Sequence, residues 1–443
     1  MTTNDRNPSV YGTLSSTRTL KPLRDLCVQK IGIQTGPFGS QLHNSDYVSI
    51  GVPIITVEHL GENIIDGKDA PLVSTEDAAR LARYTLETGD IVFSRVGSVD
   101  RRSIVSTSQR GWLFSGRLLR VRPNHELVNS TFLSYFFGLE SFKSYIRSIA
   151  VGTTMPSLNT ELLSTVPVIV PAMEEQKVIA AVLSSLDEKI RLNTEISKTL
   201  EAVAQTIFKS WFIDFDPVHA KMRGEKPEGM DDATAALFPD SFEESELGLI
   251  PKGWEVEAFG EMVTLLMGQS PPGDTYNDAG EGLPFYQGKT DFGSRFPSRR
   301  MYCTAGKRIA VKGETLISVR APVGDINQAT EKCIIGRGVA SALHKSRSEA
   351  YTFCLLSSLK PVLDFYNGEG SVFGAINGKD FSSLPIVEPP QSLVDCFNDV
   401  ASPINDQIRN LFDEINNLIS IRDALLPRLI SGELQIPDEM LAS

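Results

Sequence analysis

The sequence lacks the marks of several protein classes. Its 443 residues include five cysteines that lie far apart without a C-x-x-C pair, so we expect neither a disulfide framework nor a zinc site. No stretch reaches the roughly eighteen apolar residues that a membrane span needs, and the first residues contain no apolar signal-peptide core. We therefore expect a cytoplasmic protein without a membrane association.

Catalytic motifs are also missing. The sequence has no H-E-x-x-H, no G-x-S-x-G, no complete phosphate loop, and none of the N/D-P-P-Y/F tetrapeptides with which amino-methyltransferases hold a flipped base. Asp214 and Asp216 could form a carboxylate pair, but no basic or histidine residue stands directly beside them, which favours a turn or helix-stop role. We expect no catalytic residue, no metal and no cofactor on this chain.

A general excess of positive charge is absent too, because the formal net charge is −12. Two stretches nevertheless run against this total. Residues 95–122 contain seven arginines and one acidic residue, and residues 289–312 contain seven basic residues and one acidic residue. Arginine can pair with phosphates and with guanine in the major groove. The contrast favours a polyanionic partner, while a solvated basic face without a ligand stays open as the alternative.

An internal repeat is the strongest positive signal. Asn159, Pro167 and Pro171 recur as Asn377, Pro385 and Pro389, each pair 218 residues apart, as in 377−159. Both copies run directly into a long amphipathic pattern that predicts helices over residues 175–212 and 393–431. Strand-like segments broken by turns precede each copy. A chain that builds one globule-and-helix unit twice can present two similar surfaces.

The repeat also predicts the fold class. We expect an α+β chain in which two mixed α/β globules are separated by an antiparallel coiled coil of the two long helices, with a pseudo-two-fold internal repeat. Asn193 falls on the expected seam, where it either fixes the register or is a tolerated polar residue. The Gly-, Pro- and acid-rich segment after Trp211 reads as an extended linker rather than a third core.

Three motifs carry a family resemblance. The runs "FKSWFIDFDPV" at 208–218, "GLIPKGWEV" at 248–256 and "LLPRLISGEL" at 425–434 together resemble the conserved regions of specificity (S) subunits of type I restriction–modification systems. This resemblance implies a first target-recognition domain at 1–170 and a central conserved helix at 171–213. A linker at 214–250, a second target-recognition domain at 251–388 and a distal conserved helix at 389–443 would follow.

The resemblance also implies partners. Each globule would read one half of a bipartite, asymmetric site in double-stranded DNA, and the helices would set the spacing and dock two methyltransferase (M) subunits. S-adenosylmethionine would bind the M subunits, while ATP and Mg²⁺ would bind separate restriction (R) subunits. The assembled complex would be an adenine-specific DNA methyltransferase and, with R subunits, an ATP-dependent site-specific deoxyribonuclease. The recognised bases and the spacer length do not follow from the sequence.

Candidate contact residues come from the basic stretches and from the helices. For DNA we expect the cations Arg95, Arg101, Arg102, Arg117, Lys289, Arg299, Arg300 and Arg320. For the M subunits we expect the helix surface around Ile190, Leu200, Trp211, Ile408, Leu418 and Leu429. Two other functions compete with this interpretation: a coiled-coil protein scaffold that does not recognise DNA, and a nuclease or methyltransferase with an unrecognised active site.

Overall fold

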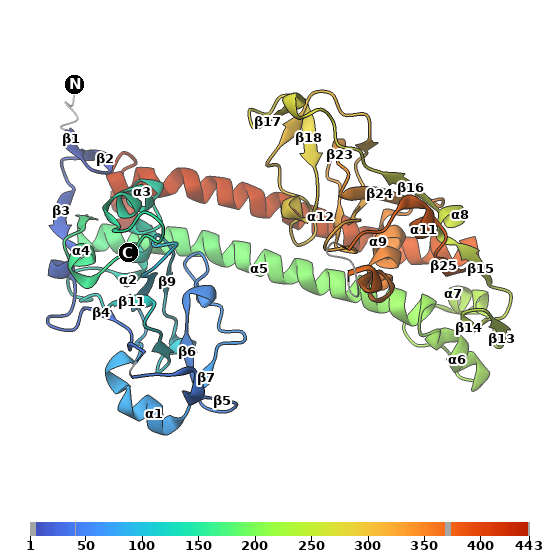
Figure 1. Cartoon of the computed structure of the whole chain (residues 1–443), viewed down its shortest axis with the longest axis horizontal. Coiled ribbons are helices and arrows are strands. Elements are labelled where there is room, and N and C mark those ends of the chain that lie inside the picture. The colour runs from blue at the N-terminus through green and yellow to red at the C-terminus, as the bar shows by residue number, and fades with distance from the viewer. Residues whose placement is uncertain (1–5, 40, 368–373, 442–443) are drawn as a thin grey trace. The chain divides into compact units, whose positions relative to one another are not determined.

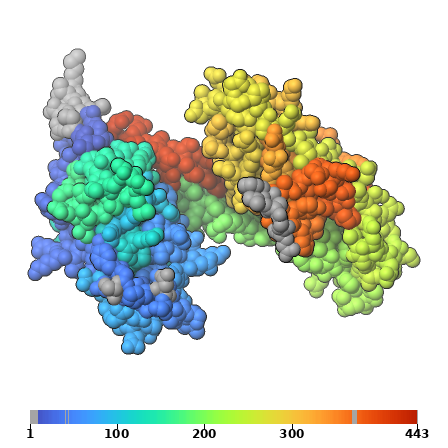
Figure 2. All heavy atoms as spheres, in the orientation of Figure 1, coloured from blue at the N-terminus to red at the C-terminus, as the bar shows by residue number. Residues whose placement is uncertain are grey.

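The computed structural model describes residues 6–39, 41–367 and 374–441. The chain divides into two compact units (Figures 1 and 2). Unit 1 comprises Met1–Leu192 and Glu414–Ser443, and unit 2 comprises Asn193–Asp413. Unit 2 is therefore one continuous segment, whereas the C-terminal part of the chain completes unit 1.

Unit 1 contains two four-stranded sheets, with the strand orders β4-β11-β8-β9 and β10-β6-β7-β5. The first sheet is antiparallel throughout, and in the second sheet β10 runs parallel to β6. Their strands are β4 (Ile33–Thr35), β11 (Leu118–Val121), β8 (Ile91–Ser94), β9 (Arg102–Ile104), β10 (Leu113–Phe114), β6 (Val52–Ile55), β7 (Leu72–Val73) and β5 (Tyr47–Val48). Every residue of β8 and β11 is buried, so these two strands form the centre of the unit.

Unit 2 repeats this plan with the strand orders β16-β24-β21-β22 and β17-β19-β18-β23-β20. Again the first sheet is antiparallel, and β18 runs parallel to β23 in the second sheet. Its strands are β16 (Val263–Met267), β24 (Val339–His344), β21 (Thr315–Ser318), β22 (Ile326–Gln328), β17 (Tyr276–Asn277), β19 (Tyr302–Cys303), β18 (Leu283–Tyr286), β23 (Cys333–Ile335) and β20 (Ile309–Ala310). Apart from β20, each strand has a counterpart in unit 1.

The segment that repeats in the sequence has the same local structure in both units. Asn159 and Asn377 each cap a short helix, accepting a hydrogen bond from a backbone N–H three residues on at 2.8 and 2.9 Å. A strand and then a long helix follow each cap. These pairs are α4 (Thr160–Ser164) with α11 (Gly378–Ser382), and β12 (Pro167–Val170) with β25 (Pro385–Glu388). β12 pairs with β3 (Thr19–Pro22) and β25 with β15 (Glu255–Ala258).

The two long helices are α5 (Met173–Phe212) and α12 (Gln391–Ser431), which confirms the predicted helices. They run antiparallel within each unit: Asp187 pairs with Arg422 at 2.8 Å in unit 1, and the rings of Phe208 and Phe397 lie 5.6 Å apart in unit 2. Not every apolar residue of the predicted amphipathic patterns is buried: Ile196, Val203 and Val400, which we expected on the apolar faces, are 39%, 43% and 44% exposed. Asn193 is buried, as its seam position predicts.

The other helices and hairpins complete the units. In unit 1 these elements are β1 (Arg6–Ser9), β2 (Gly12–Ser15), α1 (Thr75–Arg80), α2 (Ser130–Phe136), α3 (Glu140–Ile149) and α13 (Asp438–Leu441). In unit 2 they include α8 (Phe259–Met262), α9 (Glu349–Ser358) and α10 (Lys360–Asp364). The α2–α3 segment brings Phe132, Phe136 and Phe142 into the core of unit 1. Within the described ranges, no helix is long and apolar enough to cross a membrane.

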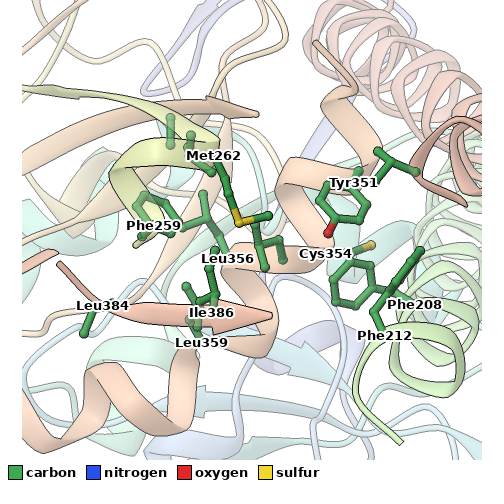
Figure 3. Packing of buried hydrophobic residues seen from close by; sticks show 14 of the residues in the cluster. Phe208, Phe212, Phe259, Met262, Tyr351, Cys354, Leu356, Leu359, Leu384 and Ile386 are labelled. Carbon is green, nitrogen blue, oxygen red and sulfur yellow. The ribbon is translucent and has the colours of Figure 1, made fainter. Parts of the chain in front are cut away.

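The core of unit 2 joins its sheets to both long helices (Figure 3). Tyr351 of α9 packs edge-on against Phe208 and Phe212 of α5, with ring centroids 5.3 and 5.4 Å apart. Trp211 is also buried in this core, 6% exposed, against Phe238 and Phe397. These aromatic contacts fix the end of α5 to unit 2.

Residues 214–250 do not form the extended linker that we expected. They fold as α6 (Asp216–Met222), α7 (Asp232–Leu237), the hairpin strand β13 (Phe242–Ser245) and the start of β14 (Gly248–Pro251). Val218 and Phe238 are fully or almost fully buried in the unit 2 core, at 0% and 1% exposure. Gly, Pro and acidic residues mark turns and caps here, but the intervening apolar side chains pack and hold the segment in place.

The role predicted for the two nearby aspartates is consistent with this structure. Asp214 lies just after the end of α5 and pairs with Lys209 of that helix, while Asp216 begins α6. Phe215 between them has a left-handed backbone with φ 53°. The two aspartates therefore lie at the turn that joins α5 to α6.

Candidate nucleic-acid interface

Four loops of unit 2 surround an open hollow of about 670 Å³. Three of the loops follow β16, β18 and β21, and the fourth precedes β24. The lining is polar and cationic and includes the side chains of Ser270, Gln287, Lys289, Thr290, Arg320 and Arg337. An open hollow of this polarity suits an extended polar partner better than an apolar small molecule.

Glycines let these loops approach one another closely. A Cβ atom at Gly268 would lie 2.2 Å from the carbonyl oxygen of Gly336, and one at Gly338 would lie 2.4 Å from that of Gln287. The backbone N–H of Gly336 also donates to the carbonyl of Tyr286 at 2.8 Å. Backbone hydrogen bonds thus connect these loops to the sheet and fix the positions of the side chains that line the hollow.

The basic residues of unit 2 differ in whether they are already paired. Lys289 pairs with Asp325 at 2.8 Å, Arg299 with Glu331 at 2.6 Å and Arg300 with Asp291 at 2.9 Å. Arg320 and Arg337 are exposed and have no acidic partner within the described part of the chain. These two guanidinium groups can bind phosphate or a guanine edge without first breaking an ion pair.

Unit 1 places the same four loops together. The N–H of Arg95 donates to the carbonyl of Arg117 at 2.8 Å, just as the N–H of Val319 donates to that of Gly338 at 2.9 Å. Gly36 and Gly268 are equivalent in the same way. The N–H of Gly36 donates to the carbonyl of the first residue of β11, and the N–H of Gly268 donates to the carbonyl of the first residue of β24. The backbone frame is therefore shared, but the side chains differ: Arg337 has Gly116 as its counterpart, and Gly338 has Arg117.

The side chains of the unit 1 loops form a different surface. Arg95 is half-buried, donates to the carbonyl of Gly116 at 3.0 Å and lies 5.2 Å from the ring centroid of Phe38. Phe38 is 53% exposed, and Arg117 and Glu58 are exposed. An exposed ring backed by arginine can stack on a base, and a carboxylate can accept from the amino group of cytosine.

Arg102 is a wrong prediction. Its side chain is buried at 2% exposure, donates to the carbonyl of Ser134 at 3.1 Å and pairs with Glu62 at 2.5 Å. Its neighbour Arg101 points to the exposed side and donates to the carbonyl of Leu60. Arg101 directly precedes β9 and Arg102 is its first residue, and successive side chains of an extended chain point in opposite directions, which separates these two arginines.

Several arginines of the first basic stretch are already engaged by groups within unit 1. Arg120 is 1% exposed and donates to Ile31 O and to Gln34 Oε1 at 2.9 and 2.8 Å, and burial lowers its pKa to about 10. A hydrogen bond to Asp90 raises the pKa of Arg122, which pairs with that carboxylate at 2.7 Å. Arg110 pairs with Glu87 at 2.9 Å. The excess of charge in the sequence therefore overstates the charge that a ligand meets.

The helix residues expected at the M-subunit contact also divide into two groups. Trp211, Ile408 and Leu429 are buried, at 6%, 2% and 7% exposure, so they cannot meet a partner on the folded chain. The other three, Ile190, Leu200 and Leu418, are half-buried. The most apolar helix positions are buried by packing within each unit. A partner would therefore contact the half-buried positions at the edges of the helices.

Arg337, Gln287 and Phe38 are not among the contact residues predicted from the sequence. Arg337 stands in "GRGVAS" directly before a buried strand. An arginine between two glycines directly before a strand indicates a tight loop with an exposed guanidinium group. The sequence therefore contained a signal for Arg337. Within the described ranges, no cluster of His, Cys, Asp and Glu could hold a metal ion.

The chain is similar to known proteins over most of its length. The sequence model of the type I restriction modification DNA specificity domain matches residues 31–202. The type I restriction enzyme MjaX specificity subunit of Methanocaldococcus jannaschii is 31% identical over 87% of this chain and 88% of its own length. The chain belongs to the family of type I restriction enzyme specificity subunits. The resemblance seen in the sequence motifs is thereby confirmed.

Two further proteins support the family and the fold. The HindI specificity subunit of Haemophilus influenzae is 25% identical over 82% of this chain and 90% of its own length. The crystal structure of the type I restriction–modification system S subunit from M. genitalium has a TM-score of 0.55 at 14% identity and covers 97% of both chains. The α+β fold class is that of specificity subunits. Family membership supports DNA recognition over the protein scaffold, and these relatives are specificity rather than catalytic subunits.

Proposed function

We propose that each unit of this specificity subunit reads one half of a bipartite, asymmetric DNA site through its four-loop surface. The observation that carries this proposal is the pair of surfaces, which share a backbone frame and differ in side chains. Arg320 and Arg337 in unit 2 have Val96 and Gly116 in unit 1 as their counterparts. Two readers with different side chains require two different half-sites.

The site residues of this proposal are narrower than the basic stretches. In unit 2 they are Arg320 and Arg337, with Lys289 available after exchange of its Asp325 partner. In unit 1 they are Arg95, Arg101 and Arg117. Arg299 and Arg300 lie in ion pairs and contribute to the surrounding charge. Unpaired cations give the larger gain on binding because no existing contact is lost.

We propose the rest of the assembly from what the resemblance to specificity subunits implies. Two methyltransferase subunits dock on the helix edges and carry S-adenosylmethionine, and adenine methylation takes place on them. Restriction subunits that use ATP and Mg²⁺ add DNA cleavage in the full complex. In this proposal no cofactor binds to this chain, and the chain acts in the cytoplasm, where the host DNA lies.

A binding experiment tests the assignment of the hollow. The complex of this chain with its methyltransferase subunits is titrated with cognate DNA at several salt concentrations. Arg320→Ala and Arg337→Ala are each expected to weaken specific binding by about 1–3 kcal/mol or to lower the salt slope by about one. Arg223→Ala is the matched control, because it removes one exposed arginine of unit 2 outside the hollow. Equal effects of all three variants would contradict the assignment.

A further inference from the structure

A loop of unit 1 that follows α3 carries exposed apolar side chains. It spans residues 151–157, and its Val151 and Met155 side chains are 61% and 64% exposed. The two threonines between them are exposed as well, and the loop contains no charged residue. Single apolar side chains are common on a protein surface, but an uncharged loop that exposes two of them indicates a surface that a partner covers.

Backbone hydrogen bonds close this loop at its base. The N–H of Val151 donates to the carbonyl of Ser157 at 3.0 Å, and the N–H of Ser157 donates back at 2.8 Å. Gly152 has a φ of 106°, and a Cβ atom there would lie 2.8 Å from the carbonyl oxygen of Met155. A loop that is closed in this way loses little conformational entropy on binding, so it can present its side chains to a partner.

Two further hydrogen bonds join the 151–157 loop to the loop after β8. The N–H of Gly97 donates to the carbonyl of Pro156, and the N–H of Leu158 donates to the carbonyl of Arg95, both at 2.9 Å. Arg95 and the loop after β8 belong to the four-loop surface that we assign to DNA. The 151–157 loop is therefore a direct neighbour of that surface.

The same two bonds recur in unit 2. The N–H of Ala321 donates to the carbonyl of Gly374 at 2.9 Å, and the N–H of Ile376 donates to the carbonyl of Val319 at 3.1 Å. Gly374 and Ile376 stand 218 residues after their counterparts in unit 1, as in 374−156. In unit 2 the loop that receives this support lines the cationic hollow with Arg320 and Ala321. The connection is thus part of the backbone frame that both units share.

The surroundings of the 151–157 loop favour DNA as the partner. Arg95 lies 5.2 Å from the ring centroid of Phe38, which is 53% exposed. The carboxylate in the loop after β8, Asp100, pairs with Arg147 at 2.5 Å, so its charge is balanced. Cationic and apolar groups therefore occur side by side here. In the major groove, thymine is the base that offers an apolar group, its C5-methyl, to such side chains.

We infer that the 151–157 loop is a fifth DNA-reading segment of unit 1, in which Met155 and Val151 contact the C5-methyl groups of thymines in the half-site of this unit. The assignment rests on the proposed function, because Met155 meets a base only when the neighbouring loops bind DNA. The arginines of those loops supply charge and hydrogen bonds, and the 151–157 loop supplies the apolar contact that distinguishes thymine from cytosine.

Deoxyuridine tests the methyl contact, because it differs from thymidine only in lacking the C5-methyl group. The complex of this chain with its methyltransferase subunits is titrated with cognate DNA in which each thymine of the recognised site, on either strand, is replaced in turn. At one or two positions within one half-site, the wild-type complex is expected to bind about fourfold more weakly, as the loss of one buried methyl group predicts. Unchanged affinity at every position would overturn the inference.

Variants connect the methyl effect to the loop. Met155→Ala is expected to bind the thymine-containing site about tenfold more weakly and to lose the uracil effect in that half-site. Met155→Leu keeps an apolar side chain and should keep the effect. Leu127→Ala is the matched control, because Leu127 is 43% exposed and lies beyond the opposite end of β11. A uracil effect that persists in full in Met155→Ala would contradict the assignment.

The same titrations distinguish a failure of the loop assignment from a failure of the proposed function. A wild-type complex that prefers cognate to unrelated DNA but is insensitive to uracil would overturn the thymine contact and leave the proposed function standing. A complex without any preference for cognate DNA would overturn both. Sedimentation without DNA tests the other class of partner: weaker assembly of Met155→Ala with the methyltransferase subunits would identify a protein as the partner of the loop and overturn the contact with DNA.

Discussion

The first basic stretch divides into arginines that hold unit 1 together and arginines that face a ligand, and one pair of variants separates the two groups. Arg122 forms a two-point contact with Asp90, Nε to Oδ1 at 2.8 Å and Nη2 to Oδ2 at 2.7 Å. Asp90 is 1% exposed and also accepts from the N–H of Glu87 at 2.8 Å. Arg122→Ala would leave this buried carboxylate without its counter-charge.

The expected loss is about 3–5 kcal/mol in the free energy of unfolding of unit 1, the usual effect of breaking a buried pair from one side. The double variant Asp90→Asn/Arg122→Ala should recover part of this loss, because the buried group is then neutral. Arg117→Ala should change the stability by no more than about 0.5 kcal/mol, since its side chain is exposed and has no partner among the described residues. Arg117→Ala should instead weaken DNA binding.

Hydrogen exchange of the amides in β8 and β11 measures the stability of unit 1 without requiring the whole chain to unfold in one step. Arg122→Ala is expected to speed this exchange by several orders of magnitude, and Arg117→Ala to leave it unchanged. Similar exchange in both variants, or a loss of DNA affinity in Arg122→Ala under conditions where the unit remains folded, would refute the division of the basic stretch.

Three further outcomes are expected. Asn193→Leu should raise the free energy of unfolding by about 1–3 kcal/mol, because the buried amide of Asn193 has no hydrogen-bond partner among the described residues. Denaturant melts measure this change, and a decrease in the free energy of unfolding would show that the amide stabilises the fold. Burial lowers the pKa of His344 to about 4, so unit 2 should be fully stabilised above pH 6.5 and lose up to about 3 kcal/mol as the pH falls towards 4. His344→Gln should flatten that dependence in melts at pH 7 and 5, and an unchanged slope would contradict it. Phe238→Ala should cost about 3–5 kcal/mol and expose 214–250 to trypsin; rapid cleavage of the wild-type segment would instead favour an extended linker.

The helices and the repeat could be predicted because they depend on local periodicity. The long amphipathic patterns and the recurrence of Asn159 as Asn377 are visible in the sequence alone, whereas the caps that these two asparagines form are seen only in the structure. The packed state of residues 214–250 could not be predicted. Val218 and Phe238 lie 20 residues apart in a segment rich in Gly, Pro and acidic residues, and only the unit 2 core supplies their partners.

The sequence could predict which basic stretches contain the candidate site, but not which of their residues face a ligand. Arg101 and Arg102 are adjacent and chemically identical, yet one is exposed and the other is bound to Glu62 and Ser134. Which arginine meets an acidic partner depends on contacts between residues about 30 to 40 positions apart, as for Arg122 and Asp90. Arg337 lies outside the densest charge and reaches the hollow because β24 begins there.

The central claim is that each unit reads its own half of one asymmetric site, and a map of adenine methylation in the host genome tests it most directly. The map is compared between strains that carry the wild-type gene, no gene, or Arg320→Ala together with Arg337→Ala. The gene is expected to add one bipartite motif with two different halves and an unread spacer, and the double variant to relax or change one half only. A palindromic motif, or a change in both halves, would contradict the account.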